Sequence, residues 1–315
     1  MERKPVIGTR GSALALWQAN RVASLLGREA EIKTIKTSGD IIKGELMTGQ
    51  SDTGFFTTEI EKKLSAGEID IAVHSLKDLP TDIPDDIVVA AYVERDFIAD
   101  LLITLPGKLE SEDPLVPAAG MKIGTSSLRR RALCAEHMPT AEVVPIRGNV
   151  DTRVKKLRQG ECDAIIIARA GFERLSADRA DLVVFELNPR MWLPSPGQGV
   201  IAAEVRKQDN EIVELVAVIG HSRTKTAVAI ERALMKLAEG GCHAPFGALA
   251  GPSAKVGEPD LWEVVAGMLD DDGAWKSIKI QGNVSTLAGL AIRLLRDSGI
   301  PKLLPEDNDR LAEKL

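Results

Sequence analysis

Residues Glu61–Val73 read EKKLSAGEIDIAV, and residues Val154–Ile166 read VKKLRQGECDAII. In both stretches Lys-Lys-Leu is followed by Gly-Glu and then by an aspartate that opens an apolar run. The first part is typical of the end of a helix with a glycine stop, and the apolar part predicts a buried strand of a parallel sheet. The repeat therefore predicts two α/β domains of similar build.

The two domains also begin alike. Val6–Ser12 reads VIGTRGS and Lys122–Ser127 reads KIGTSS, so each has a short strand, a turn and a serine that can cap the next helix. Ligands of open α/β sheets bind beyond the carboxyl ends of the strands, and helix N-termini favour anions. We expect both domains to present these turns to a shared cleft.

The same patterns predict further elements of the first domain. Apolar spacing predicts a helix from Ser12 to Gly27, and alternation predicts a strand over Ala30–Thr37. Thr57–Gly67 begins with a threonine–glutamate capping pattern and predicts a helix. Ile69–Leu76 predicts a buried strand.

The last third has a different order of elements. A helical pattern over Thr224–Gly241 precedes three strand-like runs, FGALAG, WEVVAGML and WKSIKI, and a final helical pattern covers Val284–Gly299. This order predicts a small, separate α+β domain. We expect domain 1 to comprise residues 1–96 and 197–216, domain 2 residues 97–196, and domain 3 residues 217–315.

Composition narrows the function. The chain has 315 residues and a net charge of −6, with its basic residues gathered at a few turns, which suits a small anionic ligand better than a nucleic acid. No apolar run approaches the roughly 18 residues that span a bilayer, and the N-terminus lacks a signal-peptide pattern. Three cysteines are too few for a disulfide framework, and with four histidines they form no zinc pattern. We expect a cytoplasmic monomer without a metal.

Arginines gather in two stretches, GTSSLRRR (Gly124–Arg131) and IRGNVDTR (Ile146–Arg153). Cations are disfavoured at a helix N-terminus unless an anion also lies there, and arginine pairs with carboxylates through two parallel hydrogen bonds. The alternative is a set of solvated surface ion pairs. Arg131 lies about 100° further round its helix than Arg130, so we expect Arg131 to contribute less to binding the anion.

Three other stretches are candidates for chemistry. Asp78 follows the most apolar strand of the first domain, where it is either a general acid–base group or a turn-capping residue before Pro80. Cys242 lies in a Gly-Gly loop, EGGCHAP, which favours an exposed, reactive thiol. Gln198 lies between two glycines, which indicates either a close backbone approach or a plain loop.

Seven of these stretches, in this order, resemble the porphobilinogen deaminase (hydroxymethylbilane synthase) family from Val6 to about Leu249. They are VIGTRGSALALWQA, AVHSLKDLP, GTSSLRRR, IRGNVDTR, ARAGFERL, GQGVIAAE and EGGCHAP. The resemblance implies a three-domain transferase of tetrapyrrole biosynthesis whose first two domains look like the lobes of periplasmic binding proteins. It implies that four porphobilinogen units are joined head to tail, with release of ammonia, on a covalent dipyrromethane cofactor.

The resemblance also implies the site residues. By this resemblance, the catalytic residues are Asp78 and Lys77, and Cys242 forms the thioether to the cofactor. The other cofactor contacts are Ser126, Ser127, Arg129, Arg130, Arg147 and Gly148, together with Lys77 and Asp78. The substrate contacts are Arg10, Ser12, Arg147, Arg153, Arg174 and Gln198.

The sequence departs from the family pattern at three positions. Thr53 and Thr58 stand where lysines are common, and Ala99 stands where an arginine is common. Two other functions are compatible with parts of the chain: a two-lobed protein that binds an anion without catalysis, and an enzyme that uses Cys242 as an ordinary nucleophile. A covalent adduct of two pyrrole units would distinguish the transferase from both.

Overall fold

The structure is a computed structural model, and it describes residues 3–37, 57–109, 111–175, 179–238, 245–253, 261–270 and 272–297. The chain divides into two compact units: unit 1 is Met1–Asp96 with Gly197–Thr226, and unit 2 is Phe97–Pro196 with Ala227–Leu315. The three-domain division stays a prediction. Cys242 and Thr53 lie outside the described residues.

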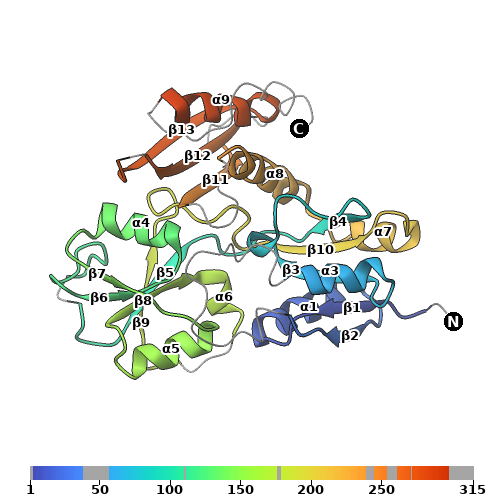
Figure 1. Ribbon diagram of the computed structural model, residues 1–315, viewed down its shortest axis with the longest axis horizontal. Helices are drawn as coiled ribbons and strands as arrows, with labels where there is room; N and C mark the ends of the chain where they lie inside the picture. The colour runs from blue at the N-terminus through green and yellow to red at the C-terminus, as the bar shows by residue number, and fades with distance from the viewer. Residues whose placement is uncertain are drawn as a thin grey trace. The chain divides into compact units, whose positions relative to one another are not determined.

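Unit 1 is built on a five-stranded sheet in the order β2-β1-β3-β10-β4. Its strands are β1 (Val6–Thr9), β2 (Glu31–Thr34), β3 (Ile71–Ser75), β4 (Ile87–Tyr92) and β10 (Ile201–Arg206). The first three are parallel, and β10 runs antiparallel to both β3 and β4. Helices α1 (Ala13–Leu26) and α7 (Asn210–Ala217) pack on one face, and α3 (Thr58–Ser65) packs on the other (Figure 1).

Unit 2 contains a second five-stranded sheet, in the order β7-β6-β8-β5-β9. Its strands are β5 (Asp100–Thr104), β6 (Lys122–Gly124), β7 (Glu142–Val144), β8 (Ala164–Ala168) and β9 (Val183–Leu187). Here β5 is the strand that runs antiparallel to both of its neighbours. Helix α4 (Leu128–His137) covers one face, and α5 (Val150–Arg158) and α6 (Arg169–Glu173) cover the other.

The two sheets have one topology, which confirms the predicted repeat of α/β halves. Strands β1, β2, β3, β10 and β4 match β6, β7, β8, β5 and β9 in order and direction. The aspartate of each repeated stretch also makes the same contact. The Asp70 carboxylate accepts from the backbone N–H of Val6 at 2.9 Å, and that of Asp163 accepts from Lys122 at 3.0 Å. Each carboxylate thus ties the start of the third strand to the start of the first.

The helix starts follow the sequence signals with one exception. The Ser12 hydroxyl accepts from the N–H of Ala15 at 3.3 Å, and the Ser127 hydroxyl accepts from that of Arg130 at 3.5 Å. Thr57 precedes α3, but its side chain caps nothing. Its backbone is helical (φ −116°, ψ −35°) rather than extended, so the hydroxyl is not directed at the first free N–H groups.

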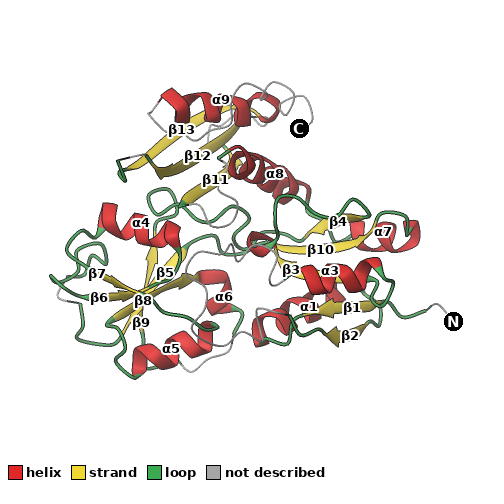
Figure 2. Ribbon diagram, in the orientation of Figure 1, coloured by secondary structure: helices red, strands yellow, loops and turns green. Residues whose placement is uncertain are grey.

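The C-terminal part of the chain contains the predicted helix, three strands and helix, and from Ala227 onward it belongs to unit 2. The elements are α8 (Ser222–Leu237), β11 (Phe246–Pro252), β12 (Leu261–Leu269), β13 (Trp275–Asn283) and α9 (Val284–Asp297), and the strands form an antiparallel sheet (Figure 2). Val264 and Ala266 of β12 face the core formed with α8 and α9, whereas Val265 joins the core around α4. None of the described helices is long and apolar enough to cross a bilayer.

Glu231 ties α8 to this sheet, which allows a direct test of the packing. Its buried carboxylate accepts from the backbone N–H of Ala250 at 2.9 Å. We expect Glu231→Ala to lower the free energy of unfolding by about 1–3 kcal/mol, because a buried N–H loses its acceptor. Glu231→Gln keeps an acceptor oxygen and should lose less, as measured by urea denaturation. Equal losses in the two variants would contradict this assignment.

Candidate active site

In unit 1, two turns at the carboxyl ends of neighbouring strands line one small hollow. The turn after β1 contributes Arg10 and Ser12, and the 3-10 turn η1 (Leu76–Asp78) after β3 contributes Asp78. The hollow has a volume of about 60 Å³. Its other lining residues are Leu14, Ala15, Gln18, Thr57, Val73, His74 and Ser75. Three of the residues predicted from the sequence are therefore brought together within this unit.

Asp78 and Lys77 occupy the 3-10 turn in different environments. Asp78 is exposed, and its carboxylate accepts no hydrogen bond from the residues that the structure describes. A turn-capping aspartate would accept such a bond, so this geometry weighs against that alternative. Lys77 is half-buried, and its ammonium donates to Oε1 of Gln198 at 3.4 Å.

The segment around Gln198 passes close to the same turn. Gly197 and Gly199 have φ angles of 74° and 86°, which non-glycine residues rarely adopt. A Cβ atom on Gly197 would lie 2.8 Å from Cγ of Leu76, and the guanidinium of Arg95 donates to the carbonyl of Gln198 at 2.9 Å. These contacts confirm the close backbone approach that the paired glycines predicted.

In unit 2, Arg129 and Arg130 lie in the first turn of α4 and are buried against one carboxylate. Oδ2 of Asp100 accepts from Nη2 of Arg129 and from Nε of Arg130, both at 2.9 Å, and Oδ1 accepts from Nη2 of Arg130 at 2.8 Å. The Trp192 indole also donates to Asp100, at 3.2 Å. Both guanidiniums donate as well to backbone carbonyls, those of Leu193 and Ile166.

Asp100 and Trp192 were not among the residues singled out from the sequence. The signal for Asp100 is that it opens an apolar strand, as Asp70 and Asp163 do. Arg130 and Arg131 point in different directions from α4, as expected from their positions on the helix. Arg130 is 6% exposed, whereas Arg131 is exposed on the surface.

A second cationic turn lies at the start of α5. Asn149 caps the helix, Arg147 and Gly148 are exposed before it, and Nε of Arg153 donates to the carbonyl of Gly148 at 2.8 Å. Burial, and then the positive charge of Arg130, lower the pKa of Arg153 to about 10. Among the described residues no carboxylate forms an ion pair with Arg153. A bound anion would relieve this repulsion.

The two turns are joined and together suit a polycarboxylate. The Ser126 hydroxyl donates to the carbonyl of Ile146 at 2.9 Å, which holds the start of α4 against the strand end that precedes Arg147. Arg129, Arg130 and Arg153 bring three positive charges against the single negative charge of Asp100. This donor set fits a dipyrromethane group, since each of its pyrrole rings carries an acetate and a propionate.

The remaining predicted residues are more scattered. Arg174 lies at the end of α6 and is 9% exposed. Ala99 is buried, and its carbonyl accepts from the N–H of Arg169. Thr58 is the exposed first residue of α3.

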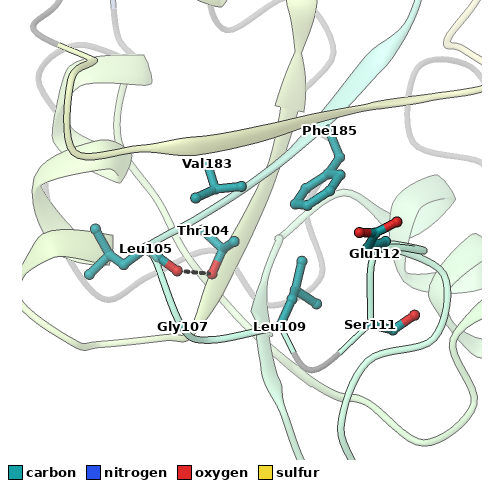
Figure 3. Close-up of a pocket in the computed structure, with 8 residues that line it drawn as sticks. All are labelled: Thr104, Leu105, Gly107, Leu109, Ser111, Glu112, Val183 and Phe185. Carbon is teal, nitrogen blue, oxygen red and sulfur yellow. Dashed lines mark hydrogen bonds between the residues drawn. The ribbon is translucent and has the colours of Figure 1, made fainter.

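Another hollow of unit 2 is lined by a different set of residues. Figure 3 shows it in unit 2, with a volume of about 410 Å³ between the loop after β5 and strand β9. Apolar side chains such as Leu109, Val183 and Phe185 form much of its wall. No predicted site residue lines it.

Comparison with known proteins gives the class of the chain and then its family. Residues 6–214 match the model of "Porphobilinogen deaminase, dipyromethane cofactor binding domain", which defines a cofactor-binding enzyme domain. The porphobilinogen deaminase of Desulforudis audaxviator is 42% identical over 254 residues, 79% of this chain and 80% of that protein. That of Chlorobium phaeobacteroides is 38% identical over 292 residues, 90% of each chain. The chain belongs to the porphobilinogen deaminase family.

Solved structures of solute-binding proteins were also matched. An ancestral cationic amino acid solute-binding protein is 14% identical, covers 69% of this chain and 87% of its own, and has a TM-score of 0.40. An ancestral arginine-binding protein bound to arginine is 18% identical, covers 70% of this chain and 91% of its own, and has a TM-score of 0.38.

The Asp100 cluster generates a prediction about stability. Asp100→Asn removes the charge that pairs with two buried guanidiniums, so we expect a loss of about 3–5 kcal/mol in the free energy of unfolding. Asp181→Asn is the matched control, because it removes an exposed carboxylate that pairs with Arg158. We expect little change for the control in chemical denaturation. If the two variants lost the same amount, the cluster would not be a stabilising centre of unit 2.

Proposed function

We propose that the chain joins four porphobilinogen units head to tail into hydroxymethylbilane and releases one ammonia for each unit. The observation that carries the proposal is the excess positive charge around Arg130 and Arg153, in a family defined by a dipyrromethane-binding domain. A chain of pyrroles is a polycarboxylate, and clustered guanidiniums suit it in an otherwise acidic protein. We also propose that the protein is a monomer of three domains and is located in the cytoplasm.

The residues of unit 2 bind and orient in this proposal. Ser126, Ser127, Arg129, Arg130, Arg147 and Gly148 hold the carboxylates of the dipyrromethane group. Arg153 and Arg174 hold those of the substrate. Asp100 keeps Arg129 and Arg130 in fixed orientations through three hydrogen bonds, so little conformational entropy is lost when an anion binds. When bound, the dipyrromethane group supplies the free pyrrole carbon from which the chain grows.

The residues of unit 1 carry the acid–base chemistry. Loss of ammonia from porphobilinogen breaks a C–N bond and leaves a cation delocalised on the pyrrole. The exposed Asp78 carboxylate stabilises that cation and exchanges protons with it. Lys77, whose ammonium contacts Gln198, helps to place the turn, while Arg10, Ser12 and Gln198 bind substrate.

Covalent attachment to Cys242 is tested by intact mass. We expect the wild-type protein to carry the mass of two pyrrole units and Cys242→Ser to carry none and to be nearly inactive. Burial raises the pKa of Cys134 to about 12 and that of Cys162 to about 11, so these thiols are poor attachment sites. Cys162→Ser is the control and should keep the adduct. An adduct of normal mass on Cys242→Ser would place the attachment elsewhere.

The role of Asp78 is tested by separating its charge from its shape. Asp78→Asn keeps the volume but cannot act as a carboxylate, so turnover should fall by at least about 10²-fold, the low end for general acid–base catalysis. Asp78→Glu keeps the charge one methylene away and should retain more activity. Steady-state ammonia release and a thermal melt are measured for both. A turn-capping role predicts the reverse order, and near-normal turnover of Asp78→Asn would remove Asp78 from the mechanism.

A further inference from the structure

Three ionisable side chains of unit 1 meet in its interior, and the proposed mechanism uses none of them. Glu61 comes from α3, His74 from β3 and Glu204 from β10. Their exposed fractions are 6%, 5% and 0%. Charged groups are rarely buried this deeply unless they are paired or serve a function.

Strand register explains how the three side chains meet. His74 is opposite Ala202 and Glu204 is opposite Ala72, so all four point to the face that α3 covers. The two small alanines leave room for the diagonal pair, and Nε2 of His74 lies 3.2 Å from Oε2 of Glu204. Glu61 reaches the same place from α3, close enough for the negative charge of Glu204 to act on it.

The matching half of the molecule builds the same place without charges. The repeated stretches pair Glu61 with Val154 and His74 with Ile167. Strand register pairs Glu204 with Ile103, because Glu204 is opposite Ala72 and Ile103 is opposite the corresponding Ile165. These counterparts all lie in one hydrophobic core between α5 and its sheet; they are Val154, Ile167 and Ile103. The architecture therefore does not require the polar trio.

His74 connects the trio to the hollow that holds Asp78, because it is one of the residues that line this hollow. We propose that Glu61, His74 and Glu204 form a buried acid–base cluster, with a proton held on Glu61, that positions His74 in the wall of the Asp78 pocket. The inference deepens the proposed deaminase reaction and rests on it. His74 is a positioning residue here, and so are the two glutamates.

The surroundings support this assignment of charge. Burial, and then the charge of Glu204, raise the pKa of Glu61 above its usual range, while Thr57 and His74 oppose the shift. The other charged groups on the packed elements are Glu59, Lys62 and Lys63 of α3 and Arg206 of β10, and Arg10 and Asp78 line the hollow. Arg206 is engaged by Asp70 and Asp209. Among the described residues, no group of three His, Cys, Asp or Glu side chains is placed to hold a metal ion.

The first experiment replaces the trio by its counterparts in unit 2. The variant Glu61→Val/His74→Ile/Glu204→Ile should fold and melt no lower than wild type, since apolar replacements of buried ion clusters are often neutral or stabilising. Its turnover should fall by about 10²-fold, as for a misplaced site. Wild-type turnover in the folded variant would overturn the proposal, and so would a much lower melting temperature, which would make the cluster architectural.

The second experiment tests the proton on Glu61 by melting Glu61→Gln between pH 4 and pH 8. A carboxyl with a raised pKa stabilises the fold at low pH and loses that contribution as pH rises through its folded pKa. The variant, which stays neutral, should therefore gain melting temperature relative to wild type as pH rises.

The control for this experiment is Glu68→Gln. Glu68 is exposed, and its bond to Lys63 lowers its pKa, so this variant should show the opposite sign or no trend. If Glu61→Gln lowered the melting temperature by the same amount at every pH, Glu61 would be ionised or would act only as a hydrogen-bond acceptor. That result would overturn the proposal that Glu61 carries a proton.

The third experiment tests whether Glu204 and His74 act as one unit. Glu204→Gln should move the ¹⁵N resonances of the His74 ring, which a remote packing change would leave in place. The turnover losses of Glu204→Gln and His74→Asn should not add in the double variant. Additive losses would overturn the coupling. If wild-type protein made no hydroxymethylbilane, the proposed function would fail, whereas the melts and the ¹⁵N spectra would still decide the state of the cluster.

Discussion

The carboxylate of Asp100 is the interaction on which unit 2 depends. It opens β5, the strand that runs antiparallel to both of its neighbours, and it accepts hydrogen bonds from two guanidiniums of α4 and from the indole of Trp192. The guanidiniums in turn bind carbonyls of β8 and of the turn at Leu193. Removing three charges from water costs several kcal/mol for each ion unless they are paired and fully hydrogen-bonded. The pairing therefore fixes strand, helix and turn in one arrangement, and it holds both guanidiniums in set orientations.

The two halves show how one topology can be given two kinds of interior. Both tie the third strand to the first through an aspartate, and both place a serine cap after a Gly-Thr turn. Unit 2 keeps an apolar core under α5 and gathers cations at its strand ends. Unit 1 lines its hollow with Arg10 and Asp78 and buries the ionisable side chains of Glu61, His74 and Glu204 under α3.

Much of this could be predicted from the sequence, because the repeat and the caps are local patterns. The repeated stretch beginning at Glu61 and Val154 gave two matching halves, and Ser12 and Ser127 cap helices as their positions predict. Periodicity did not reveal the partners of Arg129 and Arg130, because Asp100 lies in another strand and meets them only in the folded sheet. The trio was missed for the same reason: Glu204 is far from His74 in sequence, and only strand register brings them together.

Strand β10 lies between β3 and β4 in its sheet, yet it is made long after both, since β4 ends at Tyr92 and β10 begins at Ile201. As the chain leaves the ribosome, the five strands of the second sheet are all present once Leu187 has emerged, while the first sheet still lacks its fourth strand. Until then the apolar edge of β3 has no neighbour, and such edges pair readily with other chains. The half that is translated first is thus the half that closes last, and a nascent chain that stalls between the two strands is left open to aggregation.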